Sequence, residues 1–315
     1  MDALYTHLKK FGKVKANEPM KKHTTFKIGG AARFFVIVSE TDALALLLQF
    51  LDEGGTPYAV IGGGSNMLVH DEGFDGVVIQ VKTTQFRVKG TILEADAGCI
   101  TANMARESVN AGLAGFEWAV GVPGTIGGAV RGNAGAMDAE MKDCMHEVDL
   151  YQDGEETTFS REDCVFGYRD SYFKHTSAVI LRIRLQLQKG KKDEGVQKMM
   201  NCIGYRSKTQ PKGFASTGCI FKNYELAHHK GELKNHDLIP AEFLEKGRIP
   251  AGWLVEKAGM KGAVRGDIFV SDTHGNFIVN RGSGSSEDVL TLVEETKRRV
   301  YDTFGILLEE EIYIL

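Results

Sequence analysis

The sequence predicts an α+β protein with more than one domain. Residues 33–39 are rich in strand-forming side chains, residues 41–53 repeat leucine at helical spacing, and residues 58–61 form a second short strand. From Gly76 onward the pattern becomes strongly β. A chain of 315 residues is too long for one comfortable core, so we expect two or three domains with room to enclose a large ligand.

Composition and charge exclude several classes of protein. The 38 basic and 42 acidic residues give a formal net charge of −4 without a block of like charge, which is not the pattern of a nucleic-acid-binding protein. The five cysteines are scattered and never form CxxC, and the nine histidines form no helical metal pair, so we predict no metal and no disulfide framework. No apolar run has the length of a signal peptide or membrane span. We therefore expect a soluble cytoplasmic protein that binds neither nucleic acid nor membrane.

Strands and helices are expected in the following order. The first half contains a short amphipathic helix at 4–11, a strand at 33–39, a capped helix at 41–53, strands at 58–61 and 77–82, a hairpin over 86–97 turning near Gly90, and a helix at 101–110. The second half contains a hairpin over 147–160 turning at Asp153-Gly154, a half-buried strand at 181–187, a domain boundary at 189–195, a strand at 276–280, a helix from Ser285 to Gly305, and a strand at 306–315.

The most unusual stretch is residues 121–136, GVPGTIGGAVRGNAGA, which holds six of the 37 glycines. A run of this composition predicts a loop and not a stable helix or central strand. Backbone without Cβ atoms can approach a ligand closely and present N–H groups to phosphate oxygens or to the edge of a ring system. The alternative is a long surface turn with no ligand, although the interleaved Val122, Ile126 and Val130 argue against disorder.

A second glycine cluster, Gly62 to Asn66, follows the strand at 58–61. Its backbone donors, with the Ser65 hydroxyl and the Asn66 amide, suit a phosphate, and a plain glycine turn would look similar. It is neither a P-loop nor a Rossmann fingerprint, because GxxxxGK[ST] is absent and the cluster opens a strand.

Three side chains are candidates for chemistry. Arg169, in FGYRDS, could hold a carboxylate or a developing enolate, or could be a surface cation paired with Asp170. Cys219, in TGCIFKN, could give a proton or act as a nucleophile, or could be a buried small hydrophobe. Glu311 is one of three consecutive acids near the C-terminus. Such an acid either protects the edge of a sheet from pairing with another strand or directs its carboxylate into a site, and the periodicity of the sequence does not distinguish the two.

Seven motifs in order together resemble one family. They are HTTFKIGG, GGGSNMLV, GVPGTIGGAVRGNAGA, FGYRDS, TGCIFKN, AGWLVEKAGMKG and LEEEI, and they span nearly the whole chain. The combination is similar to the UDP-N-acetylenolpyruvoylglucosamine reductases, flavoenzymes of bacterial cell-wall synthesis. The chain lacks the extra loop with a substrate-binding tyrosine that longer members carry, so it resembles the shorter subclass.

The resemblance implies a two-lobed FAD-binding module of the p-cresol methylhydroxylase type, followed by a C-terminal substrate-binding α+β domain. We expect lobe 1 at 1–82, lobe 2 at 83–195, and the substrate domain at 196–305, with the strand at 306–315 returning to the FAD module. FAD is expected to be bound non-covalently, with NADPH as the hydride donor. Oligomeric state is undetermined by the sequence, and a monomer is favoured.

The resemblance also assigns residues to the site. By similarity, cofactor contacts are expected from Thr24, Thr25, Gly62, Gly63, Gly64, Ser65, Asn66, Gly121, Pro123, Gly124, Thr125, Gly127, Gly128, Asn133, Ala134, Gly135 and Arg206. Substrate contacts are expected from Tyr168, Lys222, Asn223 and His274. The lysine that relatives often place before a Gln-Pro or Leu-Pro pair is Thr209 here, preceded by Lys208, and Arg131 has no assigned role.

The implied reaction reduces UDP-N-acetylglucosamine enolpyruvate to UDP-N-acetylmuramate in peptidoglycan precursor synthesis. Hydride passes from NADPH through FAD to C3, and a proton is added at C2. Arg169 falls on the position that stabilises the enolate-like anion, Glu311 on its carboxylate partner, and Cys219 on the proton donor, which in many members is serine. Two alternatives are a flavin oxidase with a different alcohol or sugar substrate, and a non-catalytic sugar-nucleotide-binding module.

Overall fold

The computed structural model describes residues 3–229 and 233–315. Its contacts divide the chain into two compact units, each assembled from three segments. Unit 1 consists of Met1–Glu18, Ala32–Gly63 and Phe74–Arg206, and unit 2 consists of Pro19–Ala31, Gly64–Gly73 and Ser207–Leu315. The domain boundaries expected from sequence stay a prediction, and they differ from this interleaved division. Two early segments belong with the C-terminal part of the chain, an arrangement that local patterns do not show.

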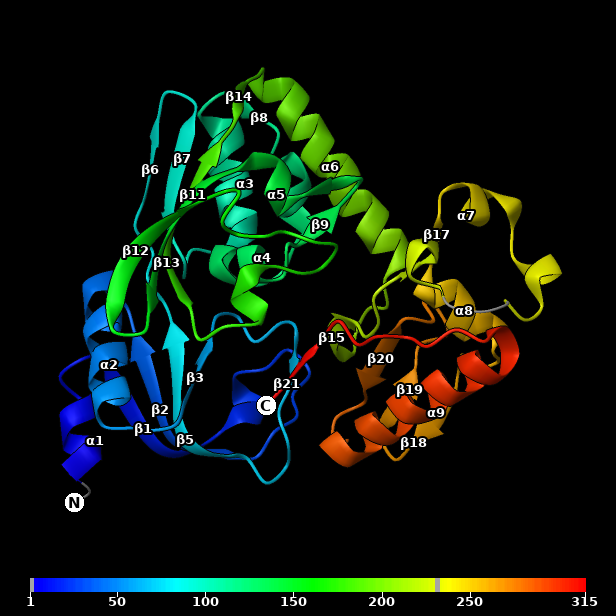
Figure 1. Cartoon of the computed structure of the whole chain (residues 1–315), viewed down its shortest axis with the longest axis horizontal. Coiled ribbons are helices and arrows are strands. Elements are labelled where there is room, and N and C mark those ends of the chain that lie inside the picture. Colours follow the sequence, from blue (N-terminus) through cyan, green and yellow to red (C-terminus); the bar gives the residue numbers. More distant parts are fainter. Residues whose placement is uncertain (1–2, 230–232) are drawn as a thin grey trace. The chain divides into compact units, whose positions relative to one another are not determined.

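Unit 1 contains two main sheets (Figure 1). The smaller has the order β1-β2-β5-β3, with β2, β5 and β3 parallel, and the larger is antiparallel with the order β12-β11-β13-β7-β6. The elements are α1 (Ala3–Leu8), β1 (Lys13–Pro19), β2 (Ala31–Val38), α2 (Thr41–Glu53), β3 (Tyr58–Ile61), β5 (Phe74–Val81), β6 (Phe86–Lys89), β7 (Ile92–Asp96), α3 (Thr101–Asn110), β8 (Leu113–Ala114), α4 (Ile126–Arg131), β9 (Gly135–Ala136), β10 (Ala139–Glu140), α5 (Met141–Cys144), β11 (Met145–Gln152), β12 (Glu155–Ser160), β13 (Val179–Gln186), β14 (Gln188–Lys189) and α6 (Lys192–Thr209).

The predicted hairpins and helices of unit 1 are confirmed. Asp153 and Gly154 both have positive φ, 52° and 90°, as a tight turn between β11 and β12 requires, and Gly90 turns the β6-β7 hairpin with φ 62°. Four leucines of α2, Leu44, Leu47, Leu48 and Leu51, are fully buried in one core together with residues of both sheets, whereas Leu46 is exposed. This apolar face explains why residues 41–53 form a helix at that position.

The prediction that residues 121–136 contain no helix is wrong. Residues 126–131 form α4, whose N-cap Thr125 accepts a hydrogen bond from the N–H of Gly128. Ile126, Ala129 and Val130 are buried in the core of unit 1. Packing of this apolar face compensates for the low helix propensity of glycine. Gly127 is required inside the helix because a Cβ there would lie 2.8 Å from the Cβ of Ala97.

Residues 189–195, which the sequence marks as a domain boundary, contain the last residue of β14 and the first turn of α6. The contact-based division instead falls at Arg206, near the end of this 18-residue helix. Gly195 is buried, and a Cβ there would lie 2.8 Å from Val109 Cγ1 in α3. The glycine that looks like a linker residue therefore permits close helix packing.

Unit 2 is built on a four-stranded sheet with the order β15-β20-β19-β18. Its elements are β4 (Met67–Leu68), β15 (Ala215–Cys219), β16 (Tyr224–Glu225), α7 (Ala241–Glu245), β17 (Arg248–Ile249), α8 (Ala251–Lys257), β18 (Val264–Arg265), β19 (Ile268–Val270), β20 (Phe277–Asn280), α9 (Ser286–Phe304) and β21 (Tyr313–Ile314). The predicted caps of α9 are confirmed, because Ser285 forms a capping box with Asp288 and Gly305 ends the helix with φ 72°.

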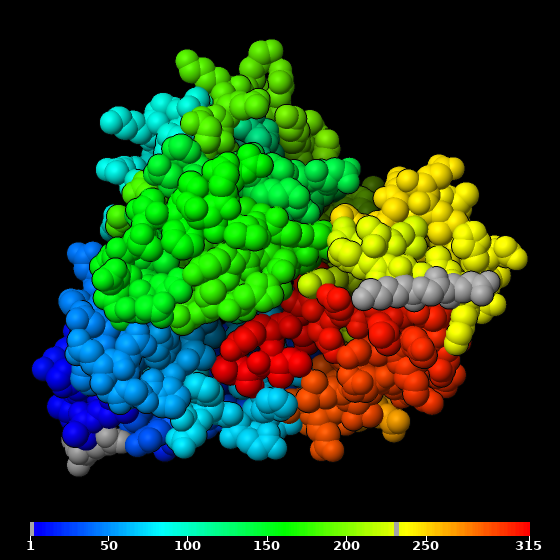
Figure 2. Space-filling model, viewed as in Figure 1, coloured from blue at the N-terminus to red at the C-terminus, as the bar shows by residue number. Residues whose placement is uncertain are grey.

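The C-terminal strand is shorter than the sequence suggests. Only Tyr313–Ile314 form β21, which pairs in parallel with Met67 and Leu68 of β4. The acids before it form a separate contact, with an isolated antiparallel bridge between Glu310 and Phe221. Figure 2 shows the C-terminal residues, coloured red, exposed on the visible face. Among the described residues, no helix has the length and apolar character needed to cross a membrane.

Candidate active site

Two glycine loops of unit 1 touch each other. The loop that ends β3 contributes Gly62 and Gly63, and the loop before α4 contributes Gly124 and Thr125. A Cβ on Gly63 would lie 2.8 Å from Gly124 Cα, and a Cβ on Gly62 would overlap Thr125 Oγ1. Glycine is therefore needed for the two loops to approach so closely.

The same loops present unused backbone donors. Within residues 3–229 and 233–315, the N–H groups of Gly62, Gly63, Gly124 and Thr125 donate no hydrogen bond to another residue. Backbone donors without acceptors suit the oxygens of an anionic ligand such as a phosphate. The expected cofactor residue Arg206 also belongs to this unit and lies against Gly121.

Arg169 is attached to the end of the glycine-rich segment. Its Nη2 donates to the carbonyl of Gly135 at 2.8 Å, and its Nη1 donates to the carbonyl of Asn133 at 3.3 Å. The residue has φ 53°, its guanidinium lies 5.2 Å from the ring centroid of Tyr168, and its side chain is 19% exposed. Two carbonyls and one aromatic face thus fix the direction of a permanent positive charge.

Asn133 is expected to contact the cofactor, but the structure gives its side chain several partners inside the protein. The amide donates to Gly167 O at 2.7 Å and to Glu140 Oε2 at 3.0 Å, and its oxygen accepts from the N–H of Lys142. Glu140 also lies 4.0 Å from Arg169 Nη1. Glu140 was not predicted as a site residue, because its contact with Arg169 joins segments that are 29 residues apart in the sequence.

Cys219 and Glu311 both belong to unit 2, where their segments are paired. Cys219 ends β15, and the next residues run beside the acidic segment. The N–H of Glu311 donates to Ile220 O at 2.7 Å, and the N–H of Lys222 donates to Glu309 O at 2.9 Å. This short ladder brings the backbone of Glu311 beside Ile220, the residue that follows Cys219.

The remaining expected cofactor residues of unit 2 hold loops together. Thr24 is buried and donates to Ile28 O, and Thr25 donates to Ser216 O at 2.7 Å and to Gly64 O at 3.4 Å. Ser65 O accepts from Thr217 Oγ1 at 3.2 Å. The HTTF and GGGSN motifs are therefore tied to the strand that carries Cys219.

The side chains of the expected substrate residues of unit 2 already make contacts within the protein. Lys222 Nζ lies 3.3 Å from Glu309 Oε2, and Asn223 Oδ1 accepts from the N–H of Ala251 at the start of α8. The Nδ1 atom of His274 accepts from the N–H of Asn276 at 3.2 Å, which leaves the proton of the neutral ring on Nε2. Burial and the nearby Lys261 lower the pKa of His274 below its ordinary value.

The other expected cofactor residues lie on or beside α4. Pro123 and Gly128 are exposed, Gly127 is buried, and the N–H of Ala134 donates to Ala129 O. Arg131, which had no assigned role, is the last residue of α4, and its carbonyl accepts from Ser171 Oγ at 2.7 Å. Among the described residues, no cluster of three or more His, Cys, Asp and Glu side chains could hold a metal ion.

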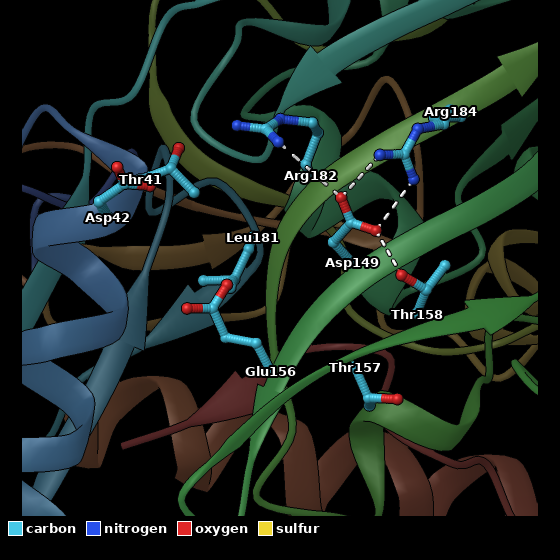
Figure 3. A pocket seen from close by; sticks show the side chains of 9 residues that line it. All are labelled: Thr41, Asp42, Asp149, Glu156, Thr157, Thr158, Leu181, Arg182 and Arg184. Atoms are coloured by element: carbon cyan, nitrogen blue, oxygen red, sulfur yellow. Dashed lines mark hydrogen bonds and ion pairs between the residues drawn. The ribbon is translucent and has the colours of Figure 1, made fainter.

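A separate polar pocket of about 310 Å³ lies on unit 1 between the start of α2 and strands β11, β12 and β13. Figure 3 shows dashed lines joining Asp149 to Arg182, Arg184 and Thr158. Asp149 accepts two hydrogen bonds of 2.9 Å from Arg184 and one of 2.8 Å from Thr158. Arg184 also binds Glu94 at 2.9 Å. None of the residues that line this pocket is an expected site residue. We expect its ion pairs to contribute to the stability of the folded protein.

Arg184→Met is expected to lower the free energy of unfolding at pH 7 by about 2 kcal/mol, between the values for exposed and buried ion pairs. Burial acts to raise the pKa values of Asp149 and Glu94, but hydrogen bonds from arginine outweigh it and hold both below their usual range. A depressed folded pKa contributes stability above the unfolded pKa of about 4, which is lost as pH falls through the folded value.

Urea unfolding of wild type and Arg184→Met at pH 7 and pH 3 measures this effect. The difference between the two proteins should shrink at pH 3, whereas the exposed control Arg106→Met should differ little from wild type at either pH. An equal loss at both pH values would mean that Arg184 stabilises through packing and not through its carboxylate partners.

Comparison with known proteins gives consistent results over nearly the whole chain. The FAD binding domain model matches residues 32–160, and the model of the C-terminal domain of UDP-N-acetylenolpyruvoylglucosamine reductase matches residues 210–315. The UDP-N-acetylenolpyruvoylglucosamine reductase of Heliobacterium modesticaldum is 37% identical over 301 residues, which are 95% of this chain and 89% of that protein. The enzyme of the same name from Bacillus subtilis is 37% identical over 308 residues, 96% and 94% of the two chains.

This chain belongs to the UDP-N-acetylenolpyruvoylglucosamine reductase family. The crystal structure of UDP-N-acetylenolpyruvylglucosamine reductase from Thermus caldophilus aligns with a TM-score of 0.75 at 32% identity, covering 96% of this chain and 98% of that one. The predicted family and fold class are confirmed, and the chain is an FAD-containing oxidoreductase. The individual site residues stay predictions.

The glycine loops of unit 1 fit the FAD that the family implies. Within the part of the chain that the structure describes, the N–H groups of Gly62, Gly63, Gly124 and Thr125 have no acceptor, and such donors can bind a pyrophosphate. The loops also leave no space for a Cβ at either glycine of the β3 loop. These residues would hold the cofactor through backbone and not through charged side chains.

Gly62→Ala is expected to destabilise the protein by about 1–3 kcal/mol and to lower its FAD content, because the added methyl group overlaps Thr125, the N-cap of α4. The matched control is Gly204→Ala in α6, where a Cβ meets nothing within 4 Å and alanine favours the helix. Thermal unfolding and the flavin-to-protein absorbance ratio measure both effects. A Gly62→Ala protein with normal flavin content would show that this close approach is not needed for cofactor binding.

Proposed function

We propose that Arg169, Cys219 and Glu311 carry out the family's reaction in this chain. That reaction is the NADPH-dependent reduction of UDP-N-acetylglucosamine enolpyruvate to UDP-N-acetylmuramate by way of FAD, in peptidoglycan precursor synthesis. When bound, FAD accepts hydride from NADPH and delivers it to C3 of the enolpyruvyl group. The observation that supports the residue assignment best is the anchoring of Arg169 by the carbonyls of Gly135 and Asn133.

Arg169 is proposed to stabilise negative charge. Reduction at C3 places charge on the α-carbon and the carboxylate of the substrate, and a guanidinium can donate two parallel hydrogen bonds to that carboxylate. Because its guanidinium is held in position by backbone carbonyls and the Tyr168 ring, it does not need to reorganise when charge develops.

Cys219 is proposed to give the proton to C2 of the substrate. The Sγ–H bond breaks as the C2–H bond forms, and the resulting thiolate regains a proton from solvent before the next turnover. Glu311 is proposed to act as the carboxylate partner, and its backbone is joined to the residue after Cys219 by a 2.7 Å hydrogen bond. Lys222, Asn223, His274 and Tyr168 are proposed substrate contacts.

The remaining assignments are less specific. We propose that the protein acts in the cytoplasm as a monomer and that it binds FAD non-covalently. The three-part domain division at residues 82, 195 and 305 is kept as a proposal for the limits of the two FAD lobes and the substrate region. Limited proteolysis with and without FAD would place these limits.

Anaerobic flavin spectroscopy tests the proposed function. The purified protein should be yellow, should bleach with NADPH, and should recover its colour when UDP-N-acetylglucosamine enolpyruvate is added. Recovery with oxygen and simple sugars or alcohols as turnover substrates, but not with the enolpyruvyl compound, would support a flavin oxidase instead. A protein that binds the sugar nucleotide without any colour change would support a binding module.

A further inference from the structure

Asn66, from the GGGSN motif, makes an unexpected contact inside unit 2. The motif suggests that its side chain reaches a phosphate, but its Nδ2 donates to the carbonyl of Glu311 at 3.0 Å. The N–H of Tyr313 donates to the carbonyl of Asn66, also at 3.0 Å. Asn66 therefore binds the chain on both sides of Ile312, 245 positions along the sequence from Glu311.

Glu311 is consequently held by both of its backbone polar groups. Its N–H donates to Ile220 O at 2.7 Å, and its carbonyl accepts from the amide of Asn66. Two hydrogen bonds on opposite sides of one residue fix the peptide planes before and after it. Because the Cα–Cβ bond follows from those planes, they also fix the direction in which the carboxylate leaves the backbone.

Ser65, the residue before Asn66, is hydrogen-bonded to β15, the strand that ends with Cys219. Ser65 O accepts from the hydroxyl of Thr217, two residues before Cys219, at 3.2 Å. One two-residue stretch, Ser65-Asn66, is thus bonded to the Cys219 strand through Thr217 and to the acidic segment through Glu311. Displacement of this stretch would move both segments together.

We propose that Asn66 is a positioning residue, whose side-chain amide orients Glu311 for the reduction of the substrate. This inference rests on the proposed role of Glu311. The residues of GGGSN would then have two different functions. Gly62 and Gly63 would supply backbone donors for the cofactor, whereas the Asn66 side chain donates one hydrogen bond to the protein backbone. The main chain from Tyr313 to Leu315 remains paired with β4 without that side chain, through Leu315 N–H to Leu68 O and His70 N–H to Leu315 O.

Asn66→Ala tests the proposal with three measurements on the FAD-loaded protein. Hydrogen exchange of the Glu311 amide should accelerate about fivefold, the effect of losing one net hydrogen bond. FAD content and bleaching by NADPH should stay within about threefold of wild type. Colour recovery by UDP-N-acetylglucosamine enolpyruvate should slow about tenfold or more, because small displacements of catalytic groups are costly.

The matched control is Asn235→Ala, which removes the same kind of bond elsewhere in unit 2, from the Asn235 amide to Thr303 O at 2.8 Å. It should leave both exchange at Glu311 and colour recovery unchanged. If Asn66→Ala does not fold, Asn66→Ser, with a shorter donor, serves for the same measurements and should show the same pattern more weakly.

Loss of FAD with unchanged exchange at Glu311 would overturn the inference and make Asn66 a phosphate ligand. Normal colour recovery in a flavin-loaded Asn66→Ala protein would also overturn it. These outcomes are distinct from failure of the proposed function, in which the wild-type protein itself would not recover its colour with the enolpyruvyl substrate, while the exchange measurement would still report on the Asn66–Glu311 contact.

Discussion

The Arg169→Ala variant is expected to recover its flavin colour with substrate about 10²–10³-fold more slowly than wild type, the usual cost of removing one preorganised charge-stabilising donor. Bleaching by NADPH should be nearly unchanged, because negative charge develops on the enolpyruvyl group only in the second half-reaction. Stopped-flow absorbance measures the two half-reactions separately. Unchanged recovery in a single turnover would exclude Arg169 from anion stabilisation.

Two further variants sharpen the Arg169 test. Arg169→Lys keeps the positive charge, but a lysine cannot bind the carbonyls of Asn133 and Gly135 with two parallel donors. Its rate of colour recovery should therefore lie between those of Arg169→Ala and wild type. Arg161→Ala removes an exposed arginine from the same unit and should behave as wild type. Equal rates of colour recovery in Arg169→Lys and wild type would mean that a positive charge alone is enough to stabilise the anion.

The Cys219→Ala variant is expected to bleach normally with NADPH and to recover its colour at least about 10²-fold more slowly, because it lacks the proposed proton donor. Cys219→Ser should restore much of the lost rate, since a hydroxyl can donate a proton from the same position. Recovery in Cys219→Ser no faster than in Cys219→Ala would mean that a proton donor at this position is not what the reaction needs.

The control for Cys219→Ala is Cys202→Ala, which removes a buried thiol from α6 in unit 1. Burial and Glu117 raise the pKa of Cys202, so it stays a neutral, inert thiol. Recovery at the wild-type rate in Cys219→Ala would remove this residue from the mechanism and direct attention to solvent as the proton source.

Local patterns predicted most of the elements but not how they combine. The hairpin turns at Gly90 and Asp153-Gly154 follow from residues that tolerate positive φ, and α9 follows from its two capped ends. Helix α4 was missed because burial of Ile126 and Val130, a tertiary effect, outweighs the glycine content. The interleaved units could not be predicted, because no local pattern reveals that residues 64–73 pack with residues beyond 207.

In the candidate site too, local patterns in the sequence do not show which groups contact one another in the folded protein. The motifs predicted ligand contacts for Asn133, Asn223 and Asn66, and the structure shows that the side-chain amides of all three bind the protein backbone. An asparagine in a motif can bind a ligand or a carbonyl with the same groups, so sequence alone does not distinguish the two. Glu140 was not predicted because its partners, Asn133 and Arg169, meet only in the folded unit.

The pairing of β4 with β21 has a consequence for biosynthesis. Residues such as Asn66 and Glu311 are 245 positions apart, and a ribosome that adds about 5–20 residues per second needs tens of seconds to deliver the second after the first. During that interval Leu68, which is buried in the finished protein, lacks the C-terminal members of its core, Ile306, Leu308 and Ile312. Unit 2 therefore completes its core only after its C-terminal segment has been synthesised.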